Sequence, residues 1–244
     1  MNVSSEYQAK YHYIGNVAEQ YDARRMSNPK WQREQDAIAN LTGKFDPGSV
    51  VLDVPLGTGR FMPIYAEMNL KVVGLDISLD MLRQADKKNG DEVRETTFVQ
   101  GDSEVLPLRT DAVDYVLCAR LLNWVPPSVL SRILAEFTRV ARKGIVVEIR
   151  LHEEISFLRA FSNFTNDLRR QDNLSASRVR RMLRRKGSID GYVLHEERFV
   201  QQVFAQNRLC LREVVRVDER TDYFKRDFQP YLMYFLGKGE FEKN

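Results

Sequence analysis

The sequence has few of the residues that build metal centres. Its 244 residues contain only two cysteines and three histidines. Cys118 and Cys210 lie far apart, and no Cys-x-x-Cys or Cys/His spacing accompanies them. These counts argue against a Cys/His metal site, and we expect none. Free cysteines without a pairing pattern also favour a reducing compartment.

Long hydrophobic runs and an excess of charge of one sign are missing as well. No segment approaches the roughly 18–20 apolar residues of a membrane span. The N-terminal segment MNVSSEYQAKYHY is polar and aromatic, unlike a signal peptide. The 37 basic and 34 acidic residues leave a net charge of +3, which by itself does not indicate a nucleic-acid partner. We therefore expect a soluble, cytoplasmic protein.

Short apolar runs alternate with segments of helical period. The runs, rich in valine, isoleucine and leucine, lie at 49–54, 70–76, 95–100, 112–119 and 144–150. The clearest helix is 127–143, where apolar residues recur every three or four positions and Gly144 follows as a stop. Near-continuous apolar strands between amphipathic helices predict a parallel sheet covered on both faces.

The rest of the chain adds to this α/β core. A helix at 195–209 and strands at 209–217 and 230–238 would complete a doubly wound, mostly parallel, seven-stranded, Rossmann-like sheet. We expect a single domain over 1–244. Its parts would be an N-terminal helical lid (1–45), a ligand-binding core (46–150), a basic helical insertion after the fifth strand (151–194), and a C-terminal helix with the last two strands (195–244).

The stretch VLDVPLGTGR at 51–60 predicts a ligand site. Gly57 and Gly59 follow the first strand, where glycine permits positive φ and lets a ligand lie against the backbone. Open parallel sheets bind ligands beyond the carboxyl ends of their strands. Asp76 and Asp102 end the second and third strands at the same edge, although Asp76 alone would suit a turn or helix cap equally well.

These strand ends, in this order, resemble the class I S-adenosylmethionine (SAM)-dependent methyltransferases. Asp53, Gly57 and Gly59 match the first motif of that family, with Pro55 in place of its first glycine. The segments 72–82, 101–108 and 110–149 are similar to the following motifs. A nicotinamide-dependent enzyme is the nearest alternative, but the third glycine of the GxGxxG pattern is absent.

The resemblance implies SAM as the cofactor and a set of residues to hold it. A carboxylate at Asp76 would accept from the ribose hydroxyls, and Asp102 from an exocyclic amine. The expected cofactor-binding residues are Tyr13, Tyr21, Asp53, Pro55, Gly57, Gly59, Asp76, Ile77, Asp102, Ser103 and Arg120. Tyr13 and Tyr21 belong to the N-terminal lid.

Few residues of the sequence indicate where the methyl acceptor binds. His152, after the fifth strand, is the candidate general base, and Asn123 and Trp124, after the fourth, are candidate substrate contacts. Eight basic residues between 169 and 186, Arg180 and Arg181 among them, favour an acidic acceptor. We expect methylation at oxygen of an anionic sugar or polysaccharide end, or of a phosphorylated metabolite. An RNA methyltransferase and a non-catalytic SAM-binding protein stay open as alternatives.

Overall fold

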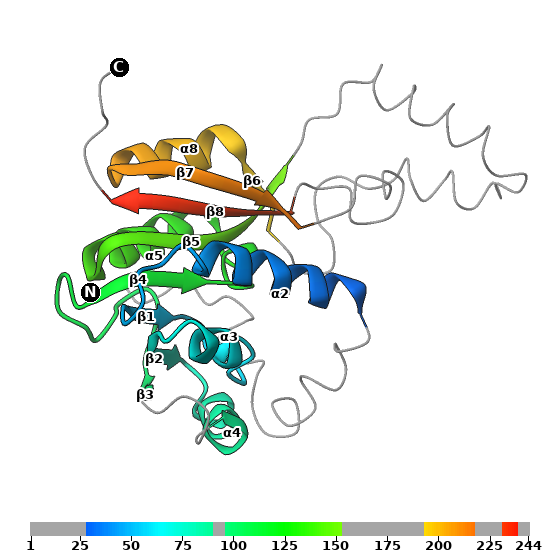
Figure 1. Cartoon of the computed structure of the whole chain (residues 1–244). Coiled ribbons are helices and arrows are strands. Elements are labelled where there is room, and N and C mark those ends of the chain that lie inside the picture. Colours follow the sequence, from blue (N-terminus) through cyan, green and yellow to red (C-terminus); the bar gives the residue numbers. More distant parts are fainter. Residues whose placement is uncertain (1–27, 90–95, 153–192, 218–230, 239–244) are drawn as a thin grey trace, which may run out of the picture.

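In the computed structural model, the residues described are 28–89, 96–152, 193–217 and 231–238 (Figure 1). One sheet organises them, in the strand order β3-β2-β1-β4-β5-β8-β7. Its strands are β1 (Val50–Asp53), β2 (Lys71–Asp76), β3 (Thr96–Gln100), β4 (Val113–Cys118), β5 (Ala141–His152), β7 (Leu209–Arg216) and β8 (Tyr231–Lys238). A two-residue strand, β6 (His195–Glu196), pairs with the end of β5.

The sheet is mostly parallel, as expected from the apolar strands. β1 to β5 pair in parallel, whereas β8 runs antiparallel to both β5 and β7. The chain passes from β1 outward to β3 and then crosses back to place β4 on the other side of β1. This reversal of strand order opens a crevice at the carboxyl ends of β1 and β4. The predicted sheet is therefore confirmed, and among the described strands only β6 was not anticipated. The expected helical insertion at 151–194 lies mostly outside the described residues.

Helices cover both faces of the sheet because the strands are apolar on both sides. Leu52 and Val116 pack into one hydrophobic cluster, and their neighbours Val51 and Leu117 pack into the other. Figure 1 shows α5 and α8 over one face and α2 and α3 over the other. The helices are α2 (Pro29–Thr42), α3 (Met62–Glu67), α4 (Leu79–Asn89), α5 (Pro127–Val140) and α8 (Glu197–Gln206), with a 3₁₀ turn, η2, at Leu122–Trp124.

Helix α5 ends three residues earlier than the sequence predicts. It stops at Val140, and β5 begins at Ala141. Arg142 and Lys143 extend as part of the strand, where Arg142 pairs with Asp114 at 3.0 Å. Gly144 is consequently not a helix stop. A Cβ there would lie 2.6 Å from the Leu236 carbonyl oxygen, so this glycine lets β8 approach β5.

The first described helix, α2, confirms part of the expected N-terminal helical region. Asn28 caps it, accepting from the Lys30 backbone N–H at 3.0 Å, and Pro29 occupies the first turn. Tyr13, Tyr21, Arg180 and Arg181 lie outside the described residues. None of the helices in the described ranges has the length and continuous apolarity that crossing a bilayer requires.

Candidate functional site

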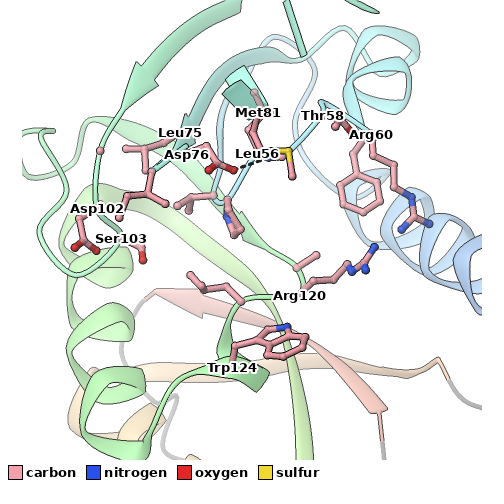
Figure 2. A pocket seen from close by; sticks show the side chains of 18 residues that line it. Leu56, Thr58, Arg60, Leu75, Asp76, Met81, Asp102, Ser103, Arg120 and Trp124 are labelled. Atoms are coloured by element: carbon pink, nitrogen blue, oxygen red, sulfur yellow. Dashed lines mark hydrogen bonds between the residues drawn. The ribbon is translucent and has the colours of Figure 1, made fainter. Parts of the chain in front are cut away.

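A cleft opens where the strand order reverses, at the carboxyl ends of β1, β2 and β4 (Figure 2). Its empty volume, part of which is open to solvent, is about 870 Å³. Figure 2 shows two acids, Asp76 and Asp102, toward one end and two arginines, Arg60 and Arg120, toward the other. The lining residues are Val54, Pro55, Leu56, Gly57, Thr58, Arg60, Phe61, Leu75, Asp76, Ile77, Met81, Gly101, Asp102, Ser103, Ala119, Arg120, Leu121 and Trp124.

The floor of this cleft, which we call the cofactor cleft after the expectation from the sequence, is the turn after β1. Gly57 and Gly59 adopt φ of +59° and +69°, the left-handed region that glycine favours. A Cβ built on Gly57 would meet nothing within 4 Å, and Gly57 lines the cleft. The missing side chain therefore leaves room for a ligand against the backbone. Pro55 also lines the cleft, and the Val54–Pro55 peptide bond is cis.

Asp76 joins the end of β2 to this turn. Its Oδ2 accepts from the Gly57 N–H and its Oδ1 from the Ser78 N–H, each at 2.8 Å. Burial raises the pKa of Asp76, against these backbone hydrogen bonds. The carboxylate thus serves the turn and also lines the cleft. Because each oxygen has a second lone-pair direction, the structural role leaves capacity for a ligand.

Other predicted cofactor residues divide into two groups. Ile77, Asp102, Ser103 and Arg120 line the cleft. The Asp102 Oδ1 accepts from the Glu104 N–H at 3.0 Å, which fixes the turn after β3.

Asp53 and Gly59 are not among the described residues that line the cleft. Asp53 is 1% exposed and accepts from the Tyr65 hydroxyl at 3.1 Å behind the turn. Burial holds the pKa of Asp53 well above its ordinary value, although the Tyr65 hydrogen bond opposes the shift. A direct contact between Asp53 and a ligand in the cleft finds no support in this placement.

Arg60 attaches helix α2 to the cofactor turn, a contact that the sequence did not reveal. Its guanidinium lies 3.5 Å from the ring centre of Trp31 and forms a buried 2.7 Å ion pair with Glu34. Arg60 also donates to the Gln35 side chain at 3.0 Å and to the Trp31 carbonyl. Contacts with these three residues of α2 thereby hold the helix beside the cleft.

A second cavity adjoins the cleft and differs from it in chemistry. It has an empty volume of about 750 Å³ and shares two residues, Arg120 and Trp124, with the cofactor cleft. Its wall is polar, and three of its residues are cationic and two acidic. The lining residues are Asn28, Lys30, Trp31, Glu34, Arg120, Asn123, Trp124, Glu148, Arg150 and Tyr231. The predicted substrate contacts, Asn123 and Trp124, therefore lie together beside the cleft.

Glu148, from the middle of β5, is held in this wall by donors from the loop after β4. Its Oε2 accepts from the Arg120 N–H at 3.0 Å, and its Oε1 accepts from Asn123 Nδ2 at 2.5 Å. The Arg150 N–H donates to Asn123 Oδ1 at 2.6 Å, which settles the orientation of that amide. The carboxylate is consequently fixed in position relative to this loop.

Tyr231 connects Glu148 to a second buried acid. Its hydroxyl donates to Glu34 Oε1 at 2.6 Å and is also hydrogen-bonded to Glu148. Burial raises the pKa of Glu148 to about 7, and the charge of Glu34 adds to the increase. Burial would also raise the pKa of Glu34, but the charge of Arg120 and the hydrogen bonds from Tyr231 and Arg60 lower it. One acid of the pair is therefore held ionised and the other titrates near neutrality.

Four residues of this site were missed: Arg60, Glu34, Glu148 and Tyr231. For Glu148 a signal existed, because a single acid interrupts the apolar run GIVVEIR, and buried acids need partners. Glu34 and Tyr231 meet across 197 positions, which no local pattern indicates. The predicted base, His152, ends β5, but its side chain lies outside what the structure describes.

Residues 51–144 match the family model described as a methyltransferase domain. A malonyl-[acyl-carrier protein] O-methyltransferase from Hamiltonella defensa is 33% identical over 110 residues, covering 45% of this chain and 40% of that protein. A demethylmenaquinone methyltransferase from Renibacterium salmoninarum is 33% identical over 132 residues, covering 53% and 52%. The chain thus spans about half, or less, of the length of these curated relatives.

Solved structures extend the likeness over nearly the whole chain. Magnesium protoporphyrin IX methyltransferase from Synechocystis PCC 6803, with bound S-adenosylhomocysteine (SAH), superposes with a TM-score of 0.62 over 95% of this chain and 92% of that one, at 16% identity. At that identity the superposition shows a shared fold. Together with the domain match over residues 51–144, it confirms the predicted resemblance to the class I SAM-dependent methyltransferases.

The residues of the cleft fit SAM, the cofactor of these methyltransferases. Gly57 leaves open space over the turn, and the Asp76 and Asp102 carboxylates supply acceptors for hydroxyl and amine donors. Apolar side chains, Leu75 and Met81 among them, line the rest of the cleft. No feature of the described lining conflicts with SAM.

Proposed function

We propose that this protein transfers a methyl group from SAM to an oxygen atom of an acceptor that carries an acidic group. The cofactor supplies an activated methyl group, and the protein supplies the position of the acceptor relative to it. The observation that carries the proposal is the second cavity, which shares Arg120 and Trp124 with the cofactor cleft and adds the cations Lys30 and Arg150.

The charge of the second cavity favours an anionic acceptor. Glu34 is already engaged by Arg60 at 2.7 Å and by Tyr231, so its charge is largely compensated. Lys30 and Arg150 lie over the Tyr231 ring, 4.2 Å and 4.6 Å from its centre. Both cations line the second cavity, and cations there suit a carboxylate or phosphate. The malonyl-[acyl-carrier protein] relative, an O-methyltransferase by name, gives independent support.

The remaining predicted residues enter the proposal in defined roles. Asp76, Ile77, Asp102, Ser103 and Arg120 would hold the cofactor. Asn123 and Trp124 would border the acceptor, and Arg180 and Arg181 would contact the same acidic group from outside the described residues. Asp53 and Gly59 would act by shaping the turn.

The test is methyl transfer from labelled SAM to paired probes, each acid against its neutral amide. We expect transfer to the acids, and Arg150→Met should raise their KM tenfold or more, the scale of a hydrogen bond to a charged group. The affinity for SAH, measured by calorimetry, should stay unchanged. Arg142→Met, at the exposed start of the same strand, is the matched control.

Transfer to amides and acids alike would refute the acidic acceptor. Transfer to RNA, with affinity falling steeply as salt increases, would favour the RNA alternative. Binding of SAH with no transfer to any probe would favour the non-catalytic alternative.

A further inference from the structure

The second cavity contains a buried carboxylate, at Glu148, that anchoring an anion does not require. A cavity that only held an acid would be expected to hold cations and neutral donors. Here Glu148, 2% exposed, lies in the wall next to Arg120, which borders both cavities. Burying an acid beside a second acid, Glu34, is unfavourable, so its presence calls for an explanation.

We propose that Glu148 is the proton acceptor for methyl transfer, and that the acceptor atom is therefore the oxygen of a hydroxyl group, separate from the acidic group that anchors the substrate. This inference rests on the proposed function. It follows from what the two kinds of acceptor need: a carboxylate has no proton to lose at neutral pH, whereas a hydroxyl oxygen must give up its proton as the new bond forms.

The position of Glu148 suits this role. Asn123 and the Arg120 N–H each occupy one carboxylate oxygen, at 2.5 Å and 3.0 Å. Tyr231 is hydrogen-bonded to the same carboxylate, and because a carboxylate has about four acceptor positions on its two oxygens, one position stays available after these three contacts. The donors thus orient the carboxylate without saturating it, and the Arg120 contact places it at the wall shared with the cofactor cleft.

The charges around Glu148 poise it near neutrality. Burial and Glu34 raise the pKa of Glu148 to about 7, while Tyr231, Arg150 and Arg120 act in the opposite direction. A base titrating near the working pH combines a useful ionised fraction with enough basicity. The titratable and charged groups that face it are Lys30 and Glu34 on α2, Cys118 on β4, Arg120 after β4, Arg150 on β5 and Tyr231 on β8, with Arg60 behind Glu34.

The proposed step transfers a methyl group to the acceptor and a proton to Glu148. The hydroxyl oxygen forms the bond to the methyl carbon, the sulfur–carbon bond breaks with its electron pair left on sulfur, and the hydroxyl proton passes to the Glu148 carboxylate. The products are a methyl ether, a neutral thioether and protonated Glu148. Loss of that proton to solvent restores the carboxylate.

A purely structural role is the alternative, because Glu148 also anchors the loop after β4. Arg120 in that loop has φ of +65°, and its N–H bonds to Glu148. If Glu148 is only structural, its replacement should affect folding and cofactor affinity but should not change how the rate of methyl transfer depends on pH.

The first test needs no acceptor. Infrared spectra of the SAH-bound protein should contain a protonated carboxyl band that titrates near pH 7 and is missing from Glu148→Gln. Buried Asp53 and Asp76, whose pKa values are also raised, contribute bands common to both proteins and cancel in the difference. A Glu148 band with a midpoint below about pH 5 would overturn the proposal.

The second test compares 1-hydroxy-2-naphthoate with 2-naphthoate, which share the carboxylate and differ in the hydroxyl. We expect transfer from labelled SAM only to the hydroxyl of the first. Its kcat/KM should rise with pH through about 7 in the wild type. Glu148→Gln should lower the rate by about 10²–10⁴-fold, the usual contribution of a general base, and remove that inflection. An inflection due to the hydroxyl of the probe would persist in the variant.

Three controls separate the explanations. Glu148→Asp, which keeps a carboxylate, should recover part of the rate, while SAH affinity stays constant in all variants. His152→Gln should leave the inflection in place, and its loss there would assign the base to His152 and overturn the proposal. Methylation of the carboxylate alone would likewise overturn it while preserving the proposed function. Failure of the wild type with both probes and with malonyl-pantetheine would remove the second cavity as an acceptor site, and this proposal with it.

Discussion

The two cavities that meet at Arg120 and Trp124 are built in different ways. The cofactor cleft takes its lining from the ends of neighbouring strands and from turns, with the backbone at Gly57 as its floor. The second cavity takes polar side chains from α2, β5 and β8. In the first, the fold itself supplies the site. In the second, the fold only brings together side chains that other proteins of this fold need not share.

This difference assigns distinct tasks to the two cavities. A site made of strand ends recurs wherever the topology recurs, which agrees with a structural likeness at 16% identity over 95% of the chain. A site made of converging side chains is particular to the sequence, and in the proposed function it would determine what is methylated. Changes in the cleft should therefore affect cofactor affinity, and changes in the second cavity should affect the acceptor and the response to pH.

The largest expected effect is from Gly57→Val in the cofactor cleft. The branched side chain would enter the space where the Cβ of Gly57 is missing, at a φ of +59° that valine rarely adopts. We expect loss of measurable SAH binding by calorimetry. Gly48→Val is the matched control, because Gly48 has φ of +78° and nothing within 4 Å but lies outside the cleft. If Gly57→Val bound SAH normally, the cleft would be misassigned.

Glu148, a buried acid of the second cavity, should make the free energy of unfolding depend on pH. The pKa of Glu148 rises from 4.5 to about 7 on folding, so the folded chain binds this proton more tightly. The stabilisation that Glu148 gains from this proton is fully present below about pH 4.5 and is lost as the pH rises through about 7. Each unit of pKa shift corresponds to about 1.4 kcal/mol. The free energy of unfolding should therefore fall between pH 5 and 8 by up to about 3 kcal/mol more in wild type than in Glu148→Gln.

Urea unfolding at the two pH values provides this measurement, and Glu136→Gln provides the control. Glu136 also accepts a backbone N–H, from Leu106 at 2.8 Å, but its pKa is lowered, chiefly by the hydrogen bond from Arg139. Its contribution is lost only as the pH falls below about 4.5. Equal slopes for wild type and Glu148→Gln between pH 5 and 8 would show that Glu148 is an ordinary ionised carboxylate.

The same contrast explains what the sequence could predict. Strand ends are encoded within a few residues, so the local pattern of VLDVPLGTGR, Asp76 and Asp102 was enough to predict the cleft. The partners of Glu148 come from the loop after β4, from η2 and from β8, and the 197 positions between Glu34 and Tyr231 leave no periodic signal. The predicted end of α5 was wrong for a related reason. Gly144 follows a segment with a local helical pattern. What requires a glycine there is the close approach of β8, about 90 residues later in the chain.

A smaller effect is expected from Asp76→Ala. The variant loses acceptors for the Gly57 and Ser78 N–H groups, and it loses any hydrogen bond that Asp76 makes to the cofactor. A hydrogen bond to a charged group contributes roughly 1.5–3 kcal/mol, so SAH affinity should fall by about tenfold to over a hundredfold.

Asp114→Ala separates the two losses in that variant. Asp114 also accepts a backbone N–H, from Val50 at 2.9 Å, but it is the second residue of β4, at the end of the strand away from the cleft. We expect a loss of stability with SAH affinity unchanged. Unchanged calorimetric affinity in Asp76→Ala would show that Asp76 serves the turn alone.

The smallest expected effect concerns the apolar rim of the cofactor cleft. Ile77 lines the cleft and is 36% exposed, whereas Leu79, two residues on, is 42% exposed and is not part of the lining. If the cofactor covers Ile77, the substitution Ile77→Ala removes apolar surface that binding would bury, for a cost of about 1 kcal/mol. SAH affinity should then fall about fivefold, and Leu79→Ala should leave it unchanged. Equal SAH affinities for the two variants would mean that the bound cofactor does not reach past Asp76 and leaves Ile77 in solvent. The adenosine end of the site would then lie closer to Asp102 and Ser103.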